Sequence, residues 1–289
     1  MKKIKYWIWA SRPQTLIASI APVFTTSILC FKYYIFNINI FLFTILAAIL
    51  IQVMTNLIND LYDYKKGSDR EGRIGPIRVV QKNLLSENEV KNAIKFLLII
   101  LILIGLYLVS HGGIAILLVG LSSFLFAYLY TATKFSIAYN GLGEIFVFTY
   151  FGIVASLGTF YLQTLTYNYS IFLLGALFGC LNICLLVINN LRDFQEDVKS
   201  SKNTLIVKLG YSFGKIEFIF INILSFIFLY ALSSTLHNNT VFYNLCPLMI
   251  LNMVVIYKTL SDINFLNYKA LPFFSMYITL FTLLLSLFI

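Results

Sequence analysis

Charged residues are scarce in this chain. Lys, Arg, Asp and Glu make up 11% of its 289 residues, and 60% of the residues are hydrophobic. Soluble globular domains carry about 25% charged residues, so this composition excludes an ordinary soluble protein of this length. The sequence also lacks Pro- or Ser-rich linkers and low-complexity tails, which predicts a single domain over residues 1–289.

Long apolar stretches take the place of the missing charge. A run of about 18 or more apolar residues is typical of a membrane-spanning helix. The apolar run after Arg12 is long and has no convincing small-residue cleavage site, so we expect a permanent first span. Nine runs predict an all-α polytopic membrane protein, with spans near 14–36, 38–60, 93–110, 114–132, 143–163, 170–191, 216–236, 241–260 and 270–289.

The net charge of +9 would indicate nucleic acid in a soluble protein, but membrane orientation explains it better. With the N-terminus in the cytoplasm, twenty of the twenty-one Lys and Arg residues lie on the cytoplasmic side, and Lys32 is the exception. Positive residues gather on that side of membrane proteins. We therefore expect the N-terminus inside, the C-terminus outside, the lipid bilayer as a partner and no nucleic acid.

Cysteine and histidine are also rare, with 4 and 2 residues. Cys180 and Cys184 lie four apart on one predicted helix, but no His or further Cys completes a tetrahedral metal site. We also find no Ser or Cys arranged as an activated nucleophile. The sequence therefore favours packing roles for the cysteines.

Acidic and amide side chains, although few, gather at the ends of two spans. TNLINDLYD (55–63) closes the second span, and INNLRDFQED (188–197) closes the sixth. An ionisable residue in a span is costly unless it faces the bundle interior or a watery cavity, so we expect the two clusters to face each other. At about 100° per residue, each cluster occupies one helical face: Asn56, Asn59, Asp60 and Asp63 on the first, and Asn189, Asn190, Asp193, Glu196 and Asp197 on the second.

The two clusters also indicate an internal repeat. Asp60 and Asp193 are 133 residues apart, with three complete spans between them. We therefore expect pseudo-repeat halves of about 1–135 and 136–260, followed by a ninth helix.

These clusters have the composition of a magnesium–diphosphate site. Carboxylates brought together repel each other unless a cation joins them, and Mg²⁺ is usually held by one or two carboxylates plus substrate phosphates. Basic side chains near a metal-bound anion stabilise a phosphate leaving group. Such residues surround both clusters: Lys65, Lys66, Arg70, Arg73 and Arg78 follow the first, and Arg192, Lys199 and Lys202 surround the second.

A third polar group lies between the two clusters. In YLYTATKFSIAYNGLGEIFVF (128–148), Tyr130 and Lys134 end the fourth span, and Asn140 and Glu144 begin the fifth. Lys134 fits either a role in the site or membrane topology alone. By contrast, Glu87 and Glu89 follow Ser86 in the pattern of a helix N-cap, so we expect them to serve the third span.

At these residues the sequence resembles the UbiA-type intramembrane prenyltransferases, most closely the branch that prenylates 1,4-dihydroxy-2-naphthoate. The resemblance covers the first three-quarters of the chain. It rests on ASRPQTLIASIAPV (10–23), TNLINDLYDYKKGSD (55–69), RIGPIRVVQ (73–81), YNGLGEIFVFTYFG (139–152), GTFYLQ (158–163) and NNLRDFQEDVKSSKNTLIVKLG (189–210).

The resemblance implies nine transmembrane helices in a bacterial cell membrane, Mg²⁺, and a site near the cytoplasmic face. There a polyprenyl diphosphate would prenylate 1,4-dihydroxy-2-naphthoate with loss of CO₂, giving demethylmenaquinol for menaquinone biosynthesis. By the same resemblance Asn59, Asp60, Asp63, Asp193 and Asp197 hold the Mg²⁺–diphosphate, and Arg73, Arg78, Lys134 and Lys202 neutralise it, with Tyr130 beside them. Further substrate-binding candidates are Asn56, Asn189, Asn190, Arg192, Glu144 and Arg12.

Two of these roles stay open at this point. The first motif of the superfamily often has an acid where this chain has Gly67, and Asp69 is the next acid, so a metal contact by Asp69 is uncertain. Arg12 either meets the carboxylate of the acceptor or anchors the first span.

Other readings of the sequence predict different functions. The same fold can prenylate another aromatic acceptor, such as 4-hydroxybenzoate, a homogentisate or a chlorophyllide. A secondary transporter also uses intramembrane acids and repeats, but its site lies near the bilayer midplane, whereas these acids lie at helix ends. A non-catalytic scaffold would not need acids in register on two distant helices.

Overall fold

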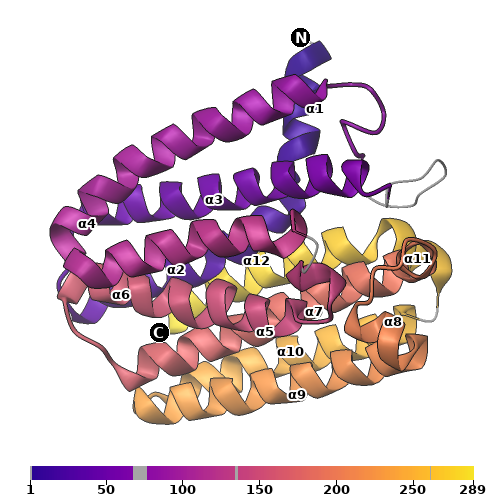
Figure 1. Cartoon of the computed structure of the whole chain (residues 1–289). Coiled ribbons are helices and arrows are strands. Elements are labelled where there is room, and N and C mark those ends of the chain that lie inside the picture. The colour runs from indigo at the N-terminus through magenta and orange to yellow at the C-terminus, as the bar shows by residue number, and fades with distance from the viewer. Residues whose placement is uncertain (1, 68–76, 134–135, 261) are drawn as a thin grey trace.

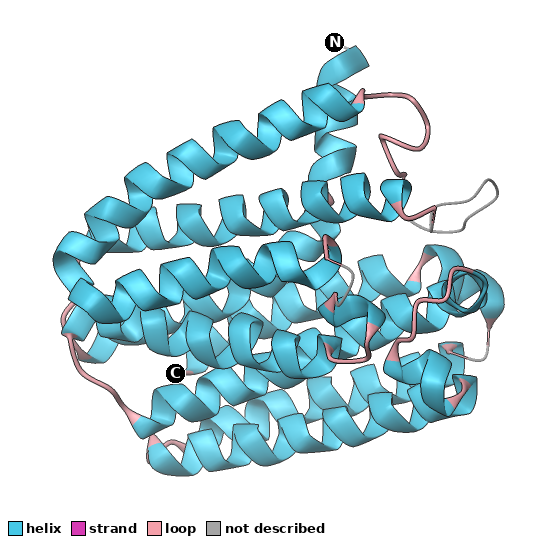
Figure 2. Cartoon of the chain, viewed as in Figure 1, coloured by secondary structure: helices cyan, strands magenta, loops and turns pink. Residues whose placement is uncertain are grey.

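The computed structural model describes residues 2–67, 77–133, 136–260 and 262–289. Figure 2 shows helices joined by loops, with no strand in these described ranges. In chain order the helices are α1 (Lys2–Ser11), α2 (Pro13–Tyr33), α3 (Ile38–Lys65), α4 (Glu87–Thr131), the 3₁₀ helix η1 (Ile137–Tyr139), α5 (Gly143–Phe148), the π-helix η2 (Thr149–Val154), α6 (Ala155–Thr164), α7 (Tyr169–Lys199), α8 (Leu205–Leu209), α9 (Tyr211–Thr235), α10 (Asn239–Thr259), α11 (Ile263–Tyr268) and α12 (Ala270–Phe288).

The helices confirm the all-α membrane fold. In the described part of the chain, eight helical stretches are long and apolar enough to span a membrane. One of them, α4, is interrupted at Gly113, whose φ of 62° and ψ of −150° are not helical. Figure 1 shows α4 turning back on itself, so it supplies the two spans expected near 93–110 and 114–132. The count therefore agrees with nine expected spans.

Three helix boundaries differ from the predicted spans because polar residues extend the helices beyond the apolar runs. Helix α4 begins at Glu87, where Ser86 and Glu89 form the expected capping box. Helices α3 and α7 continue to Lys65 and Lys199 rather than ending near residues 60 and 191. Both Asn/Asp clusters are therefore helical throughout, so their spacing is that of an α-helix. The pseudo-repeat of residues 1–135 and 136–260 stays a prediction.

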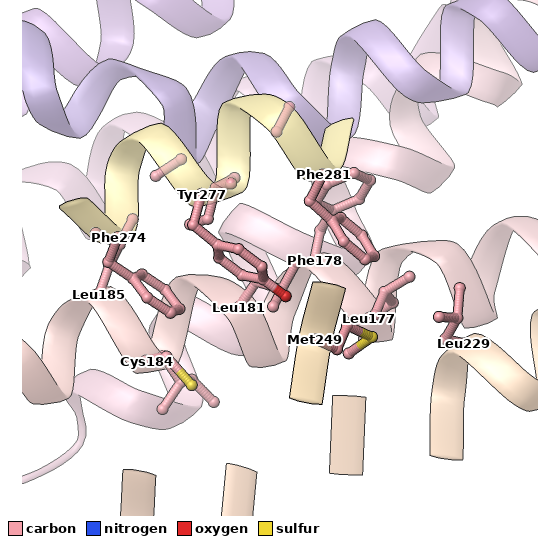
Figure 3. Packing of buried hydrophobic residues seen from close by; sticks show 14 of the residues in the cluster. Leu177, Phe178, Leu181, Cys184, Leu185, Leu229, Met249, Phe274, Tyr277 and Phe281 are labelled. Atoms are coloured by element: carbon pink, nitrogen blue, oxygen red, sulfur yellow. The ribbon is translucent and has the colours of Figure 1, made fainter. Parts of the chain in front are cut away.

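Helix α7 is the centre of the bundle. In its most apolar window 89% of the residues are buried, against 17–50% for the other candidate spans. Its Leu177, Phe178 and Leu181 pack with Phe274 and Phe281 of α12 (Figure 3). The acidic end of α7 is thereby fixed in position relative to the rest of the bundle. By contrast, α4 exposes a row of Leu and Ile side chains, as expected of a surface that faces lipid.

Close glycine contacts hold the segment α5–η2 against α7. A Cβ atom on Gly152 would lie 2.4 Å from the carbonyl oxygen of Gly175 and 2.6 Å from the Cα of Gly179. The π-helix changes the backbone pairing of this segment, and Nδ2 of Asn182 donates to the carbonyl of Phe151 at 2.7 Å and to that of Ala18 at 3.0 Å. One buried amide thus ties together α2, η2 and α7.

Helix α1 packs across the end of α3 instead of extending the first span (Figure 1). A small apolar cluster joins Ala10 of α1, Leu57 and Leu61 of α3, and Val79 and Val80 of the segment that precedes α4. This cluster fixes the backbone that directly follows Arg78.

Candidate active site

A polar cavity of about 180 Å³ lies where the ends of α2, α3, α4, α5 and α7 meet. Both Asn/Asp clusters contribute to its wall, so the structure brings together segments that are more than a hundred residues apart. The predicted site residues that line it are Arg12, Asn56, Asn59, Asp63, Arg78, Tyr130, Glu144, Asn189, Asn190, Arg192, Asp193 and Lys202.

Five predicted residues are not among those that line the cavity. Asp60 and Asp197 belong to the described residues but lie behind its wall. Asp69, Arg73 and Lys134 lie outside the described residues, so their roles stay predictions.

The α3 wall is held in place by hydrogen bonds to neighbouring helices. Nδ2 of Asn56 donates to the carbonyl of Ser11 at 2.9 Å and to the Thr15 hydroxyl at 3.3 Å. The Thr131 hydroxyl, at the end of α4, donates to Oδ1 of Asn59. The first cluster is therefore oriented by α1 and α2 on one side and by α4 on the other.

Arg78 interacts with both Asp60 and Asp63, but the two acids have different roles. Its Nη2 donates to Oδ2 of Asp63 at 2.8 Å, and its Nη1 lies 3.6 Å from Oδ1 of Asp60. Asp60 also accepts a hydrogen bond from the backbone N–H of Val79 at 3.0 Å. Asp60 thus anchors the segment that carries Arg78, whereas Asp63 and Arg78 both reach the cavity.

The α7 wall carries two further ion pairs. Nε and Nη2 of Arg192 donate to the two carboxylate oxygens of Asp193 at 2.7 and 3.0 Å. Nζ of Lys202 lies 3.4 Å from Oδ1 of Asp197. Paired in this way, the buried carboxylates avoid the free-energy cost of an isolated charge.

A third part of the wall comes from α5. Glu144 lies in the first turn of α5 and is 8% exposed. Nδ2 of Asn190, on α7, donates to Oε1 of Glu144 at 3.3 Å. Tyr130 and Glu144 line the same cavity, which brings the third polar group of the sequence to the two Asn/Asp clusters.

The segment between α4 and α5 connects both clusters, and the sequence did not predict this role. The Tyr139 hydroxyl donates to Oδ1 of Asp63 at 3.0 Å. Nζ of Lys66 lies 4.1 Å from the Tyr139 ring centre and donates to the carbonyls of Thr131 and Thr133 at 2.6 and 2.8 Å. Burial lowers the pKa of Lys66, while neighbouring Asp63 opposes this shift.

Residues that follow the second cluster hold the same segment from the other side. The backbone N–H of Asn203 donates to the carbonyl of Tyr139 at 3.2 Å, and Nζ of Lys208 donates to that of Asn140 at 2.7 Å. Lys66 was expected to be one of the bases near the diphosphate, and Lys208 was not expected in the site. Both instead bind backbone carbonyls of this segment, and neither lines the polar cavity.

Two amide residues of the wall were also missed. Gln52 and Asn182 line the cavity, and both lie inside apolar runs. Gln52 is four residues before Asn56, and Asn182 is seven before Asn189, so helical periodicity places them on the faces already identified. That periodicity is the signal that would have found them.

A second, apolar cavity of about 330 Å³ adjoins the polar one. It runs between α3, α4, η2 and α6 and is lined mainly by Leu, Ile, Val, Ala and Gly. Gln52, Thr55, Phe146 and Phe151 line both cavities. A charged compartment therefore lies directly beside an apolar one that is suited to a hydrocarbon chain.

The donors of the polar cavity fit a magnesium ion that is shared with a phosphate ligand. Carboxylates of Asp63 and Asp193 and amide oxygens of Asn59 and Asn189 are the hard ligands that Mg²⁺ prefers. Among the described residues, no three Asp, Glu, His or Cys side chains are close enough to hold a metal by themselves. Mg²⁺ is usually held by one or two carboxylates completed by substrate phosphates and water, and Asp63 and Asp193 supply two carboxylates to this cavity.

Comparison with known proteins agrees with this geometry. The model of the UbiA prenyltransferase family matches residues 19–285. The 1,4-dihydroxy-2-naphthoate octaprenyltransferase of Haemophilus influenzae is 36% identical over 225 residues, which cover 74% of this chain and 72% of the relative. The enzyme of the same name from Escherichia coli is 34% identical over 216 residues, which cover 73% of this chain and 70% of the relative.

A solved structure shows the same fold. A UbiA homologue from Archaeoglobus fulgidus, bound to DMAPP and Mg²⁺, superposes with a TM-score of 0.70 at 14% identity, over 96% of this chain and 97% of the homologue. Since the family model spans nearly the whole bundle, and relatives are 34–36% identical to the chain over the aligned residues, this chain is an enzyme of the UbiA prenyltransferase family.

Proposed function

We propose that this enzyme transfers a polyprenyl group from polyprenyl diphosphate to 1,4-dihydroxy-2-naphthoate, with loss of CO₂, to give demethylmenaquinol for menaquinone biosynthesis. The observation that carries the proposal is the junction of the two cavities. A compartment with carboxylates and bases lies beside an apolar one, and the two share Gln52, Thr55, Phe146 and Phe151 as lining residues. A prenyl diphosphate has the same division into a charged head and an apolar tail. The naphthoate acceptor is supported by the names of the relatives.

The polar cavity supplies the groups that bind the diphosphate. Arg78, Arg192 and Lys202 line it and balance the charge of the phosphate oxygens. Asp63, Asp193, Asn59 and Asn189 would hold Mg²⁺, which neutralises charge on the departing diphosphate when it is bound. Because the two acids are paired with arginines in the structure, binding would exchange these contacts for contacts with the ligand.

The apolar cavity supplies a place for the chain and keeps water away from the reacting carbon. The allylic C–O bond to diphosphate breaks, and the electron-rich ring carbon that bears the carboxylate forms the new C–C bond. The bond to the carboxylate then breaks, CO₂ leaves, and its electron pair restores the aromatic ring. The walls formed by Phe146 and Phe151 exclude the water that would quench the allylic cation.

The orientation in the membrane is also part of the proposal. The basic residues predict a cytoplasmic N-terminus and an outer C-terminus, which places the polar cavity at the cytoplasmic face of a bacterial cell membrane. Water-soluble naphthoate would then reach the site from the cytoplasm, while the polyprenyl donor enters from the lipid.

The first test is an activity assay with purified enzyme in nanodiscs. A radiolabelled polyprenyl diphosphate is incubated with 1,4-dihydroxy-2-naphthoate without oxygen, and the lipid-soluble product is followed with Mg²⁺ or with a chelator. We expect metal-dependent prenylnaphthoquinol, with stoichiometric CO₂ and diphosphate. Asp63→Asn and Asp193→Asn are expected to lower kcat by about 100-fold or more, because each removes a charge at the proposed metal–diphosphate contact.

Asp262→Asn provides a matched control, since Asp262 caps α11 away from both cavities and is expected to leave kcat unchanged. If the donor is consumed only with 4-hydroxybenzoate or a homogentisate, the acceptor assignment is wrong and the prenyltransfer stands. No donor turnover with any aromatic acceptor, by enzyme that is folded, contradicts the proposed reaction.

A further inference from the structure

Glu144 differs from the other acids of the polar cavity. Asp63 is paired with Arg78 at 2.8 Å, and Asp193 is paired with Arg192 at 2.7 Å. Glu144 also lines the cavity and is 8% exposed, yet it has no ion pair with any described residue. Its side-chain partner is the amide of Asn190, whose Nδ2 donates at 3.3 Å.

Glu144 lies in the polar compartment, on the same short helix as a residue of the junction. It lies two residues before Phe146, which lines both cavities. Tyr130 lies beside the same short helix, since a Cβ atom on Gly143 would lie 3.4 Å from the Tyr130 hydroxyl. Glu144 therefore lines the polar compartment close to the junction, where the proposed reaction needs the acceptor ring to meet the allylic carbon.

A carboxylate that has no cation beside it favours some ligand groups and repels others. It repels diphosphate oxygens and the carboxylate of an aromatic acid, but it accepts a strong hydrogen bond from a hydroxyl group. Asn190 is its one side-chain donor in the described structure, at 3.3 Å, and a carboxylate can accept several hydrogen bonds. An aromatic acceptor with a ring hydroxyl can donate a hydrogen bond to Glu144. The arginines and the lysine of the cavity then bind the anionic groups of the two substrates.

We propose that Glu144, oriented by Asn190, binds a ring hydroxyl of the aromatic acceptor and thereby selects hydroxylated acceptors; this rests on the proposed prenyltransfer. The hydrogen bond to the carboxylate increases the electron density of the ring, and it fixes which ring carbon faces the donor. The contact acts on the acceptor and not on the donor diphosphate.

The test is a comparison of ligand pairs that differ only in their hydroxyl groups. Binding of 1,4-dihydroxy-2-naphthoate and of 2-naphthoate is measured by calorimetry without oxygen, with Mg²⁺ and an unreactive thiolodiphosphate donor analogue present. The wild type is compared with Glu144→Gln, which is isosteric, and with Glu144→Asp, which keeps the charge. Glu217→Gln is the matched control, because Glu217 is also 8% exposed and unpaired among the described residues but lines neither cavity.

We expect Glu144→Gln to weaken binding of the dihydroxy compound by about tenfold or more, the usual effect of losing a charged hydrogen-bond partner. Binding of 2-naphthoate and of the donor analogue is expected to change by less than about twofold, within the range of unrelated substitutions. Glu144→Asp is expected to retain more of the preference for hydroxyl groups, and Glu217→Gln to behave as the wild type.

Two results would overturn the inference. Equal weakening of both naphthoates by Glu144→Gln would show a general structural role. Weaker binding of the donor analogue, or a shifted Mg²⁺ requirement, would place Glu144 at the metal–diphosphate instead.

If 1,4-dihydroxy-2-naphthoate is not the acceptor, the binding measurements give a different result. If the wild type ignores naphthoates but binds 4-hydroxybenzoate more tightly than benzoate, the proposed acceptor is wrong, and the same comparison across that pair tests Glu144. Discrimination that is equal in the wild type and in Glu144→Gln, for whichever acceptor binds, rejects the role.

Discussion

The Tyr139 hydroxyl donates a hydrogen bond to Oδ1 of Asp63 at 3.0 Å, and the Tyr139 carbonyl accepts one from the backbone of Asn203 at 3.2 Å. Asp63 belongs to the first Asn/Asp cluster, and Asn203 follows the second. The two clusters are therefore joined through one residue of the segment between α4 and α5. Because Asp63 faces the cavity, this contact sets the direction of a carboxylate in the proposed metal site.

Tyr139→Phe removes the hydroxyl but keeps the ring against Lys66. We expect kcat/KM for the polyprenyl diphosphate to fall about tenfold, since a hydrogen bond to a charged group contributes about 1.5–3 kcal/mol, and we expect the Mg²⁺ concentration at half-maximal activity to rise. Tyr64→Phe is the control, because Tyr64 is 38% exposed and no hydrogen bond of its hydroxyl is found in the described structure. An unchanged Mg²⁺ dependence in Tyr139→Phe would contradict the positioning role.

Arg78→Ala should destabilise the protein as well as inactivate it. The change leaves Asp60 and Asp63 buried without their nearest cation, and breaking a buried pair costs about 3–5 kcal/mol. Thermal unfolding in detergent measures the effect. Lys82 is four residues away and its side chain is exposed, so Lys82→Ala is expected to have the melting temperature of the wild type. Equal melting temperatures for the Arg78 and Lys82 variants would show that Arg78 does not stabilise the fold.

Lys66→Ala should loosen the segment between α4 and α5, because Nζ of Lys66 binds the carbonyls of Thr131 and Thr133 and the hydroxyl of Ser136 at 2.6, 2.8 and 3.1 Å. Limited proteolysis in detergent is expected to cut residues 132–142 several-fold faster. The neighbouring Lys65→Ala is a close control. Nζ of Lys65 lies 3.8 Å from the half-exposed Glu87 and 5.3 Å from the Tyr62 ring centre, and such surface ion pairs contribute about 0–1 kcal/mol. Equal cleavage rates in the two variants would show that Lys66 does not hold this segment in place.

Gly152→Ala should disrupt the packing of η2 on α7. The added Cβ would meet backbone atoms of Gly175 and Gly179 at 2.4 and 2.6 Å, and backbone cannot move aside as a flexible side chain does. We expect a loss of at least about 1–3 kcal/mol, typical of overpacking, seen as a lower melting temperature. A Cβ atom on Gly158 would have open space around it, so Gly158→Ala should have the melting temperature of the wild type. A Gly152→Ala protein as stable as the wild type would show that the fold does not need the close approach of η2 and α7.

Filling the apolar cavity should change the preferred donor length. Gly120 lines this cavity, and a Cβ there meets nothing within 4 Å, so Gly120→Leu places a side chain in open space. We expect kcat/KM to fall about tenfold for a long polyprenyl diphosphate but little for geranyl diphosphate. Only the long chain extends into the part of the cavity that the new side chain occupies. An equal decrease for both donors would argue that the chain lies elsewhere.

Much of the fold followed from composition and periodicity alone. A chain with 11% charged residues and long apolar runs has few stable arrangements other than a helical membrane bundle, because lipid leaves no partner for unpaired backbone groups. The Asn and Asp residues at the ends of α3 and α7 were recognisable for a related reason, since polar groups there are costly unless they share a cavity.

Only the tertiary structure decided what each of those polar groups contacts. Asp60 and Asp63 lie on one helical face within roughly 100°, yet Asp60 anchors the backbone of Val79 while Asp63 lines the cavity. The link through Tyr139 and the contact of Glu144 with Asn190, rather than with a basic residue of the described structure, likewise depend on segments far apart in the chain. Helical spacing determines the face on which a side chain lies, but its partner depends on which other element packs against that face, and that is set by the whole bundle.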